Sequence, residues 1–486
     1  MKKEQKIKEI SRRNFIQHSA VAAAAFTIVP RHVLGGVGFT APSDKLLIAG
    51  VGVGGKGESD LKSFHDGGNA EIAFLCDVDD QRAANSIKRF PKAKYYKDWR
   101  KLYEKEAANF DAVSVATPDH NHAIITLAAM QMGKHVYVQK PLTHDIYESR
   151  VLEEAARKYK VVTQMGNQGA SNDGPRIMAE WFDEGLIGDV HTVYCWTDRP
   201  VWPQGIPWST QKAEVPKELD WNLWLGTAPD QSYISKLVPF NWRGWWEYGT
   251  GALGDMGCHL VEAPFSVLGL KSPTDVQCSV GSVYVDEFQR GYFPESCPPS
   301  SHVILTFPKT NKTKSEVTLH WMDGGIQPVR PEELGPNEVF GDGGNGVLFI
   351  GTKGKMMCGT YGTNPQLLPT SKTERTQLKE KYARVPGKAS GHYGQWVNAA
   401  IAGYGKQYVS SPFEIACPLN ETLLIANLAI RGFDIREERA DGKGYTYPGR
   451  YIKLLWDSEQ MKVTNFEAAN QFVKRKYRDG WNLQGL

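Results

Sequence analysis

The chain has 486 residues, and its 41% hydrophobic and 23% charged content is ordinary for a globular protein of two domains. The formal net charge is +3, but residues 1–41 carry seven Lys or Arg and two Asp or Glu, so the remainder carries −2. This balance excludes nucleic acid and anionic membranes as expected partners.

Residues 1–41 are predicted to be an export leader. Ser11 to Ile16 has the Ser-Arg-Arg-x-Phe-aliphatic form of a twin-arginine signal, and the apolar run Ala20 to Val29 follows it. That run is ten residues long, which is too short to span a bilayer as a helix and typical of a signal sequence. We therefore expect a periplasmic protein, exported folded by the twin-arginine route, with no membrane span after processing.

Residues 42–166 are predicted to form a doubly wound parallel sheet of Rossmann type, because short apolar runs alternate with helical stretches at a regular period. Asp145 and Glu148 have the spacing of a helix capping box, and Gly133 follows a helix as a C-terminal glycine. The expected strands are Lys45–Val51, Ala70–Asp77, Asp111–Thr117, His135–Gln139 and Val161–Met165.

Residues 167–486 are predicted to form a C-terminal α+β domain with a large, mostly antiparallel, open sheet. Longer alternating segments appear there, separated by connections rich in Pro and Gly. The clearest of them are 190–198, 301–308, 315–323 and 346–357.

A glycine-rich turn follows the first predicted strand. Gly52, Gly54, Gly55 and Gly57 form a G-x-G-x-x-G pattern that opens a helical stretch, and Asp77 ends the next strand twenty residues later. Such glycines let the backbone approach a pyrophosphate, while the carboxylate accepts hydrogen bonds from ribose hydroxyls. A carboxylate there repels a 2′-phosphate and no Arg follows directly, so the pattern favours NAD over NADP.

Two further strand ends are expected at the same ligand crevice. One carries Thr117 and Pro118, followed by His120 and His122; we interpret the second histidine as a cleft-facing cofactor contact rather than a metal ligand. The other carries Gln139 and Lys140, and the Lys140 ammonium could hydrogen-bond a substrate oxygen and stabilise a developing alkoxide.

Asp255 and His259 lie four residues apart in a predicted helix and therefore on one face of it. A histidine oriented by a carboxylate can take a proton from a substrate hydroxyl. Zinc would need further ligands that the spacing does not supply, and the seven cysteines are scattered, so no metal site is predicted.

Eight of the fourteen tryptophans lie between residues 196 and 246. Aromatic faces with polar edges suit a sugar ring, although a large aromatic core is the alternative for any single Trp. The candidate substrate-binding residues are Asn167, Arg243, Trp245, Asp255 and His259.

Together these motifs resemble the Gfo/Idh/MocA oxidoreductase family, which includes glucose–fructose oxidoreductase and inositol dehydrogenase. The resemblance runs from about Asp44 to the C-terminus and is carried by the glycine turn with Asp77, "ATPDHNH", "GKHVYVQKPL" and "GALGDMGCH". It implies that Lys140 contacts nicotinamide ribose and substrate, that Asp255 and His259 complete the catalytic set, and that the open sheet supports a homo-oligomer. Gln139 departs from the family's usual glutamate and keeps its hydrogen-bonding capacity without its charge.

The resemblance implies oxidation of a secondary hydroxyl of a sugar or glycoside, with C3 of a glucoside as the first position to test. Export without a free nicotinamide pool implies that NAD is held tightly and recycled in place. Two alternatives remain open: a redox-neutral, NAD-dependent glycosidase acting by oxidation and elimination, and a non-catalytic saccharide-binding protein.

Overall fold

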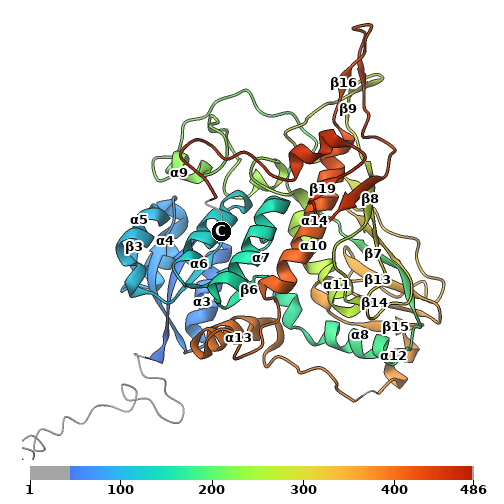
Figure 1. Cartoon of the computed structure of the whole chain (residues 1–486), viewed down its shortest axis with the longest axis horizontal. Helices are drawn as coiled ribbons and strands as arrows, with labels where there is room; N and C mark the ends of the chain where they lie inside the picture. Colours follow the sequence, from blue (N-terminus) through green and yellow to red (C-terminus); the bar gives the residue numbers. More distant parts are fainter. Residues whose placement is uncertain (1–43, 378, 484–486) are drawn as a thin grey trace, which may run out of the picture. The chain divides into compact units, whose positions relative to one another are not determined.

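The computed structural model describes residues 44–377 and 379–483, so the predicted leader lies outside the described residues. From Leu46 onward the chain forms one compact unit built on two sheets. Figure 1 shows the first sheet with its helices in blue and teal and the second, larger sheet with β7, β13 and β14 on the opposite side.

The first sheet has six parallel strands in the order β3-β2-β1-β4-β5-β6. This is the Rossmann order, in which strands are added to one side of β1 as far as β3 and then to its other side from β4, so a crevice opens at the carboxyl ends of β1 and β4. The prediction of a doubly wound parallel sheet is confirmed, and the short strand β3 is the one that the apolar runs had not indicated. The strands are β1 Leu46–Val51, β2 Ala70–Cys76, β3 Lys94–Tyr96, β4 Ala112–Val115, β5 His135–Val138 and β6 Thr163–Met165.

Helices connect these strands, and their ends follow local sequence signals. The predicted capping box forms at α7, because Asp145 accepts from the backbone N–H of Glu148 and Glu148 accepts from that of Asp145. The helices are α3 Lys56–Asp66, α4 Asp80–Arg89, α5 Trp99–Glu106, α6 His122–Gln131 and α7 Ile146–Tyr159, with short 3₁₀ turns η2 Ala107–Asn109 and η3 Asp119–Asn121.

The second sheet has nine strands in the order β15-β14-β13-β7-β12-β11-β8-β18-β19. Only β7 and β12 pair in parallel, so the predicted large, mostly antiparallel sheet is confirmed. Every second side chain of β11 is buried, which gives the sheet one core-facing side. The strands are β7 Val190–Trp196, β8 Asp275–Val280, β11 Ser301–Phe307, β12 Val317–Met322, β13 Gly346–Gly351, β14 Lys355–Cys358, β15 Gln366–Leu368, β18 Leu454–Asp457 and β19 Lys462–Val463.

The remaining elements cover or connect the sheets. Two small hairpins project from the molecule near the top of Figure 1. The hairpins pair β9 Tyr284–Asp286 with β10 Gln289–Arg290 and β16 Glu437–Glu438 with β17 Tyr445–Thr446. The helices are α8 Asp173–Asp183, α9 Trp221–Leu225, α10 Gly251–Leu260, α11 Glu262–Leu268, α12 Ser371–Arg375, α13 Lys388–Ala402 and α14 Phe413–Phe433, with 3₁₀ turns η4 Gln168–Ser171, η5 Asn241–Gly244, η6 Thr360–Gly362 and η7 Glu467–Phe472.

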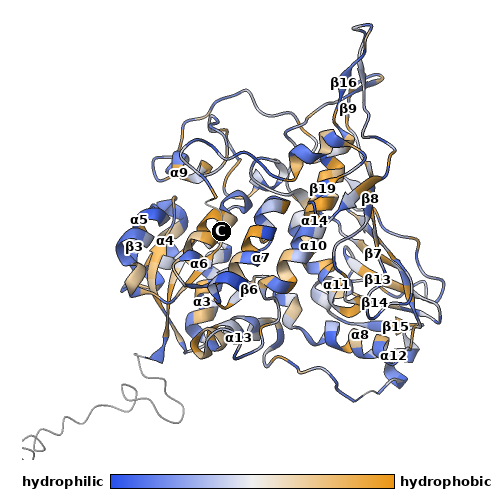
Figure 2. Cartoon of the chain, in the orientation of Figure 1, coloured by the Kyte–Doolittle hydropathy of each residue, from blue (hydrophilic) through white to orange (hydrophobic). Residues whose placement is uncertain are grey.

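Helix α14 joins the two halves of the core, because it packs against α7, α10 and β8. Figure 2 shows apolar residues gathered in the strands and along α6 and α14. Of the described helices, α14 alone has the length and hydropathy of a membrane span, but 83% of its most apolar window is buried within the protein. Helix α13 packs against α3 and β1, so a segment from the predicted second domain covers the parallel sheet.

Candidate functional site

The glycine-rich turn leads directly from β1 into α3. A Cβ on Gly52 would lie 2.6 Å from the carbonyl carbon of Ala116, and one on Gly57 would overlap the carbonyl oxygen of Gly52. Gly52 also has a φ of +78°, which favours glycine. The turn therefore needs these glycines, and it leads into the N-terminus of α3, where helix geometry favours a phosphate.

Arg82 of α4 lies against the same turn. A Cβ on Gly54 would lie 2.8 Å from the carbonyl oxygen of Arg82, and one on Gly55 would overlap its guanidinium. The absence of bulk at both glycines thus lets a cation approach the turn, where it can offset the charge of a pyrophosphate. The sequence did not indicate this arginine, because it follows Asp77 at a distance of five residues rather than directly.

Asp77 lines the same crevice, immediately after β2. One of its carboxylate oxygens accepts from the backbone N–H groups of Val53 at 2.8 Å and Gly54 at 3.2 Å, and the other accepts from that of Asp79 at 3.0 Å. Burial raises the pKa of Asp77, although these N–H groups partly offset the effect. In addition to the expected ribose contact, the carboxylate thus fixes the turn itself.

Lys140 follows β5 and is paired with Asp255 of α10. Its Nζ donates to Asp255 Oδ1 at 2.8 Å and to the carbonyl oxygen of Asp255 at 2.9 Å, while Arg243 Nε lies 3.5 Å from the same carboxylate. Burial raises the pKa of Asp255, but the charges of Lys140 and Arg243 outweigh it and lower that pKa to about 2. Asp255 therefore stays ionised and holds the Lys140 ammonium in a fixed position.

His259 lies one helical turn beyond Asp255 and faces the same cavity. The structure corrects one expectation: no hydrogen bond joins Asp255 to His259 in the described part of the chain, because the carboxylate is directed to Lys140. The rings of His259 and Tyr361 meet edge-to-face with their centres 4.5 Å apart, and the buried Nδ1 of His259 has no hydrogen-bond partner among the described residues. Burial and the charge of Lys140 hold the pKa of His259 well below its usual range, so the ring is neutral and can accept a proton.

One cavity of about 440 Å³ connects the glycine turn to these side chains. Its wall includes the expected residues Gly52, Gly54, Asp77, Thr117, Pro118, Gln139, Lys140, Arg243, Asp255 and His259. It also includes Trp202 and Trp242 from the predicted tryptophan cluster, and residues that the sequence did not indicate, among them Lys56, Asp119, Gln168 and Tyr361. They come from positions far apart in the chain, and only the fold brings them together.

Asp119 is the most strongly perturbed of these unexpected residues. Its buried carboxylate accepts from the hydroxyl of Thr250 at 3.0 Å. Burial raises the pKa of Asp119 to about 7, although the charge of Arg243 opposes this shift. A carboxyl group that is half-ionised near neutral pH in the wall of a cavity is a candidate functional group.

The two histidines after Pro118 lie behind the cavity wall and not in it. The ring nitrogens of His122 lie 2.8 Å from the carbonyl oxygen of Pro141 and 2.7 Å from that of Thr117. Those of His120 lie 3.3 Å from the carbonyl oxygen of Tyr248 and 3.1 Å from that of Trp224. The fully buried His122 thus differs from the expected cleft-facing contact, because backbone carbonyls occupy both sides of its ring.

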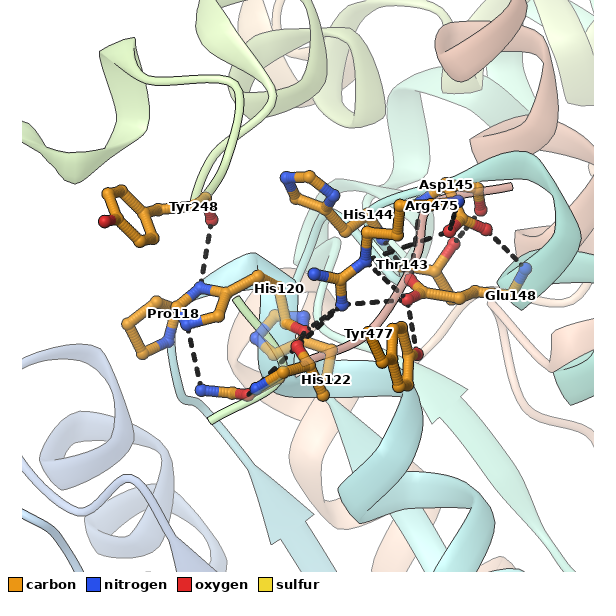
Figure 3. Close-up of polar contacts among 12 residues, drawn as sticks. Pro118, His120, His122, Thr143, His144, Asp145, Glu148, Tyr248, Arg475 and Tyr477 are labelled. Atoms are coloured by element: carbon orange, nitrogen blue, oxygen red, sulfur yellow. Dashed lines mark hydrogen bonds and ion pairs between the residues drawn. The ribbon is translucent and has the colours of Figure 1, made fainter. Parts of the chain in front are cut away.

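Figure 3 shows how the C-terminal segment supports this wall. Arg475 donates to Glu148 at 3.0 Å and to the hydroxyl of Thr227 at 2.8 Å, and it also donates to the carbonyl oxygen of His120. The hydroxyl of Tyr477 donates to the same Glu148 carboxylate at 2.6 Å. Arg475 thereby joins Glu148, at the start of α7, to His120, which directly follows Asp119.

Gln139 belongs to a buried network on the opposite side of the cavity. Its Nε2 donates to Asp60 Oδ2 at 2.6 Å, and the other oxygen of Asp60 accepts from Lys56 and, at 2.9 Å, from the hydroxyl of Tyr393. Asp60 is fully buried, and its burial raises its pKa against the effect of these donors. The carboxylate that Gln139 lacks is therefore present in its hydrogen-bond partner, Asp60.

Two of the expected substrate residues are placed outside the cavity wall. Asn167 is 1% exposed, and neither polar atom of its side-chain amide has a partner within the described ranges. Trp245 is buried and packs edge-to-face on Trp208 with ring centres 4.6 Å apart, which matches the alternative of an aromatic core. No group of three or more potential metal-ligating side chains is placed to hold a metal ion among residues 44–377 and 379–483.

Comparison with known families gives two matches. Residues 46–167 match the oxidoreductase family with an NAD-binding Rossmann fold, and residues 190–287 match the C-terminal alpha/beta domain of the same family. Levoglucosan dehydrogenase of Pseudarthrobacter phenanthrenivorans is 24% identical over 195 residues, which are 40% of this chain and 42% of that protein. A glycosyl hydrolase family 109 protein of Shewanella pealeana is 26% identical over 205 residues, 37% of this chain and 44% of that one.

These alignments cover less than half the length of the curated relatives, whereas the structural matches are longer. A levoglucosan dehydrogenase solved with NADH and levoglucosan superposes with a TM-score of 0.53 at 16% identity, covering 80% of this chain and 98% of the other. The WlbA dehydrogenase of Bordetella pertussis, solved with NADH and UDP-GlcNAcA, gives 0.53 at 14% identity, with coverage of 79% and 95%. At these identities the likeness shows a shared fold.

Proposed function

Because both matching domains are those of the Gfo/Idh/MocA oxidoreductase family, the chain belongs to that family, and we propose that it is an NAD-dependent oxidoreductase acting on a secondary hydroxyl of a sugar or glycoside. The observation that carries this proposal is a single cavity that joins the glycine turn to Lys140 and His259. A nucleotide and a hydroxyl-bearing substrate can meet there.

The residues of the turn fit NAD. Gly52 and Gly54 line the cavity without side chains of their own, and the N-terminus of α3 lies beside Lys56 and Arg82. When bound, NAD supplies the acceptor for the hydride that leaves the substrate carbon. The carboxylate of Asp77 is suited to the ribose hydroxyls of this cofactor.

The proton is handled by residues of this chain. The Lys140 ammonium, held by Asp255, can donate a hydrogen bond to the substrate oxygen and stabilise the negative charge that develops on it. His259 lines the cavity as a neutral ring, so it can accept the hydroxyl proton. Asp255 stays ionised throughout and acts as the positioning residue for Lys140.

The aromatic wall supports a saccharide as substrate. Trp202, Phe240 and Trp242 line the cavity, and such rings pack against the C–H faces of a sugar. The similarity to a levoglucosan dehydrogenase supports the same class of substrate. Oxidation at C3 of a glucoside is the first position to test.

A second candidate is the redox-neutral glycosidase reaction, which the similarity to glycosyl hydrolase family 109 proteins favours. Oxidation of one carbon acidifies the neighbouring C–H, the glycosidic substituent is eliminated, water adds, and the hydride returns. Product analysis separates the two: a keto-sugar supports the dehydrogenase, whereas a released sugar without net reduction of NAD supports the glycosidase.

The twin-arginine pattern leads to a further part of the proposal, which is periplasmic function with a cofactor carried across the membrane. The pattern at Arg12 and Arg13 supports it. The variant with Arg12→Lys and Arg13→Lys should remain in the cytoplasm, whereas export of this variant at the normal level would contradict the route. Nucleotide released from the exported protein on denaturation should be NAD in near-stoichiometric amount.

The central experiment compares Lys140→Met with the exposed control Lys101→Met. Turnover of glycosides, followed by the absorbance of reduced nicotinamide, should fall about 1,000-fold in the first variant and stay unchanged in the second, while both retain NAD. Full turnover in Lys140→Met, or a protein that binds glycosides but never reduces NAD, would refute the enzyme and leave the saccharide-binding alternative.

A further inference from the structure

The cavity wall has an excess of positive charge on its substrate half, by which we mean the lining residues from 199–243 together with Asp119, Lys140 and α10. Lys140, Arg199 and Arg243 are cations there, and Asp119 and Asp255 are the acidic residues. Asp119 is only half-ionised near neutral pH, because burial raises its pKa to about 7. The three cations are therefore incompletely neutralised before a substrate enters.

Arg199 contributes most to this excess. Arg199 lines the cavity, and no carboxylate lies within ion-pairing distance of its guanidinium in the part of the chain that the structure describes. By contrast, the other arginine that reaches this half, Arg243, lies 3.5 Å from Asp255. A guanidinium that faces a cavity without a carboxylate partner is available for an anion from outside.

Arg243 is held in place but not neutralised. Its guanidinium stacks over the rings of Trp242 at 4.3 Å and Phe240 at 4.5 Å, and it donates to the carbonyl oxygen of Phe240. Of the described carboxylates, the one within ion-pairing distance of Arg243 belongs to Asp255 and is already bound by Lys140 at 2.8 Å, so Asp255 is shared by two cations. Stacking fixes the plane of the guanidinium, and the side chain of this cavity-lining residue remains 24% exposed.

An aromatic pair in the same wall adjoins Arg243 and includes a tryptophan close to Arg199 in sequence. Trp202 follows Arg199 by three residues and meets Phe240 edge-to-face with ring centres 5.7 Å apart, and Phe240 carries Arg243 on its face. Such a wall offers apolar faces to the C–H groups of a sugar ring and cations to a substituent on its rim.

The cofactor half does not share this excess once NAD is bound. Lys56, Arg82 and Lys97 line it, and Asp77 and Asp79 lie among them. The pyrophosphate of NAD brings two negative charges to this half, which satisfy its cations. The cofactor therefore does not neutralise the cations of the substrate half.

From this distribution of charge, and resting on the proposed function, we propose that the substrate is an acidic saccharide, a sugar or glycoside that carries a carboxylate, and that Arg199 and Arg243 bind this carboxylate. The planar fork of a guanidinium matches the two oxygens of a carboxylate, which fixes the orientation of the ring as well as its charge. The orientation in turn decides which hydroxyl reaches Lys140 and His259.

The test uses the protein loaded with NAD and a matched pair of probes, methyl β-glucoside and methyl β-glucuronide, which differ only in the carboxylate. Calorimetric titration should show the glucuronide binding at least about tenfold more tightly at low salt, with the advantage shrinking as ionic strength rises. In Arg199→Gln the ratio of the two affinities should fall about tenfold, whereas the exposed control Arg89→Gln should keep the ratio of the wild type.

Equal affinities for the two probes, or a preference that Arg199→Gln leaves intact, would overturn the inference. Glucose 6-sulfate serves as a third probe, and a preference for sulfate without one for carboxylate would also overturn it. Reduction of NAD is measured on the same samples. If the two probes bind equally well but the neutral glucoside is turned over, the proposed function stands and the carboxylate site is refuted. If the glucuronide binds preferentially but NAD is never reduced, the proposed function is refuted and the carboxylate site stands.

Discussion

The contact between Gln139 and Asp60 allows a quantitative prediction, in which Gln139→Glu makes stability strongly dependent on pH. Gln139 Nε2 donates to Asp60 Oδ2 at 2.6 Å, and the two residues are 4% and 0% exposed. A glutamate at this position would place two carboxylates in contact without water. They cannot both be ionised there, so the pair must retain one proton to well above the usual carboxyl range.

The magnitude follows from the burial and the contact. A shift of about 3 pKa units is typical of a buried carboxyl group beside a like charge, and it corresponds to about 4 kcal/mol of unfolding free energy. Because the pKa is raised in the folded state, the variant is least affected below the unfolded value of about 4.3. The loss grows as the pH rises and is complete above the raised pKa, near about pH 7.

The assay is denaturant unfolding of the wild type and Gln139→Glu at several pH values between about 4.5 and 8. The matched control is the double variant Asp60→Asn with Gln139→Glu, which restores a single carboxylate to the same network and should remove most of the extra pH dependence. Parallel stability curves for the wild type and Gln139→Glu would refute the like-charge reasoning. A double variant that remains as pH-sensitive as Gln139→Glu would show that the effect arises elsewhere.

Three other predictions follow from single contacts. Arg475→Met leaves the carboxylate of Glu148 buried without its cation and should lower the unfolding free energy by about 3 kcal/mol in chemical denaturation, whereas an unchanged midpoint would contradict this. Gly57→Ala forces a Cβ into the carbonyl oxygen of Gly52 and should abolish NAD binding in a titration, whereas Gly394→Ala, where a Cβ meets nothing within 4 Å, should bind NAD normally. Because the pKa of His259 is lowered, kcat/KM should fall only as the pH drops below about 6.5, and an acid limb above that value would exclude this histidine as the base.

Patterns close together in sequence predicted most of the fold. The glycine turn, the strand ends that carry Thr117 and Lys140, and the capping box at Asp145 each depend on a few neighbouring residues, and the structure forms all three. The common helical face of Asp255 and His259 followed from helical periodicity in the same way. Local backbone geometry dictates these features, so a single sequence suffices to indicate them.

The partnerships within the site could not be read in this way. Asp60 is 79 positions from Gln139, and Arg475 is 327 positions from Glu148. Tyr361 reaches His259 only because η6 packs against α10. The prediction that Asp255 orients His259 was wrong for a related reason. Helical spacing places the two residues one turn apart, but the ammonium of Lys140, after β5, is a stronger partner for a carboxylate than a neutral imidazole.

This choice of partner has a consequence for the direction of the reaction. A carboxylate bonded to His259 would raise the pKa of the ring and stabilise it once it had taken a proton. Here Asp255 bonds to Lys140 instead, and burial together with the Lys140 charge lowers the pKa of His259, so its protonated form releases the proton more readily than an ordinary imidazolium. Such an acid returns its proton readily to a carbonyl oxygen when hydride comes back to the neighbouring carbon. Under the proposed recycling of NAD in place, the lowered pKa of His259 therefore assists the return step at the expense of proton uptake in the forward step.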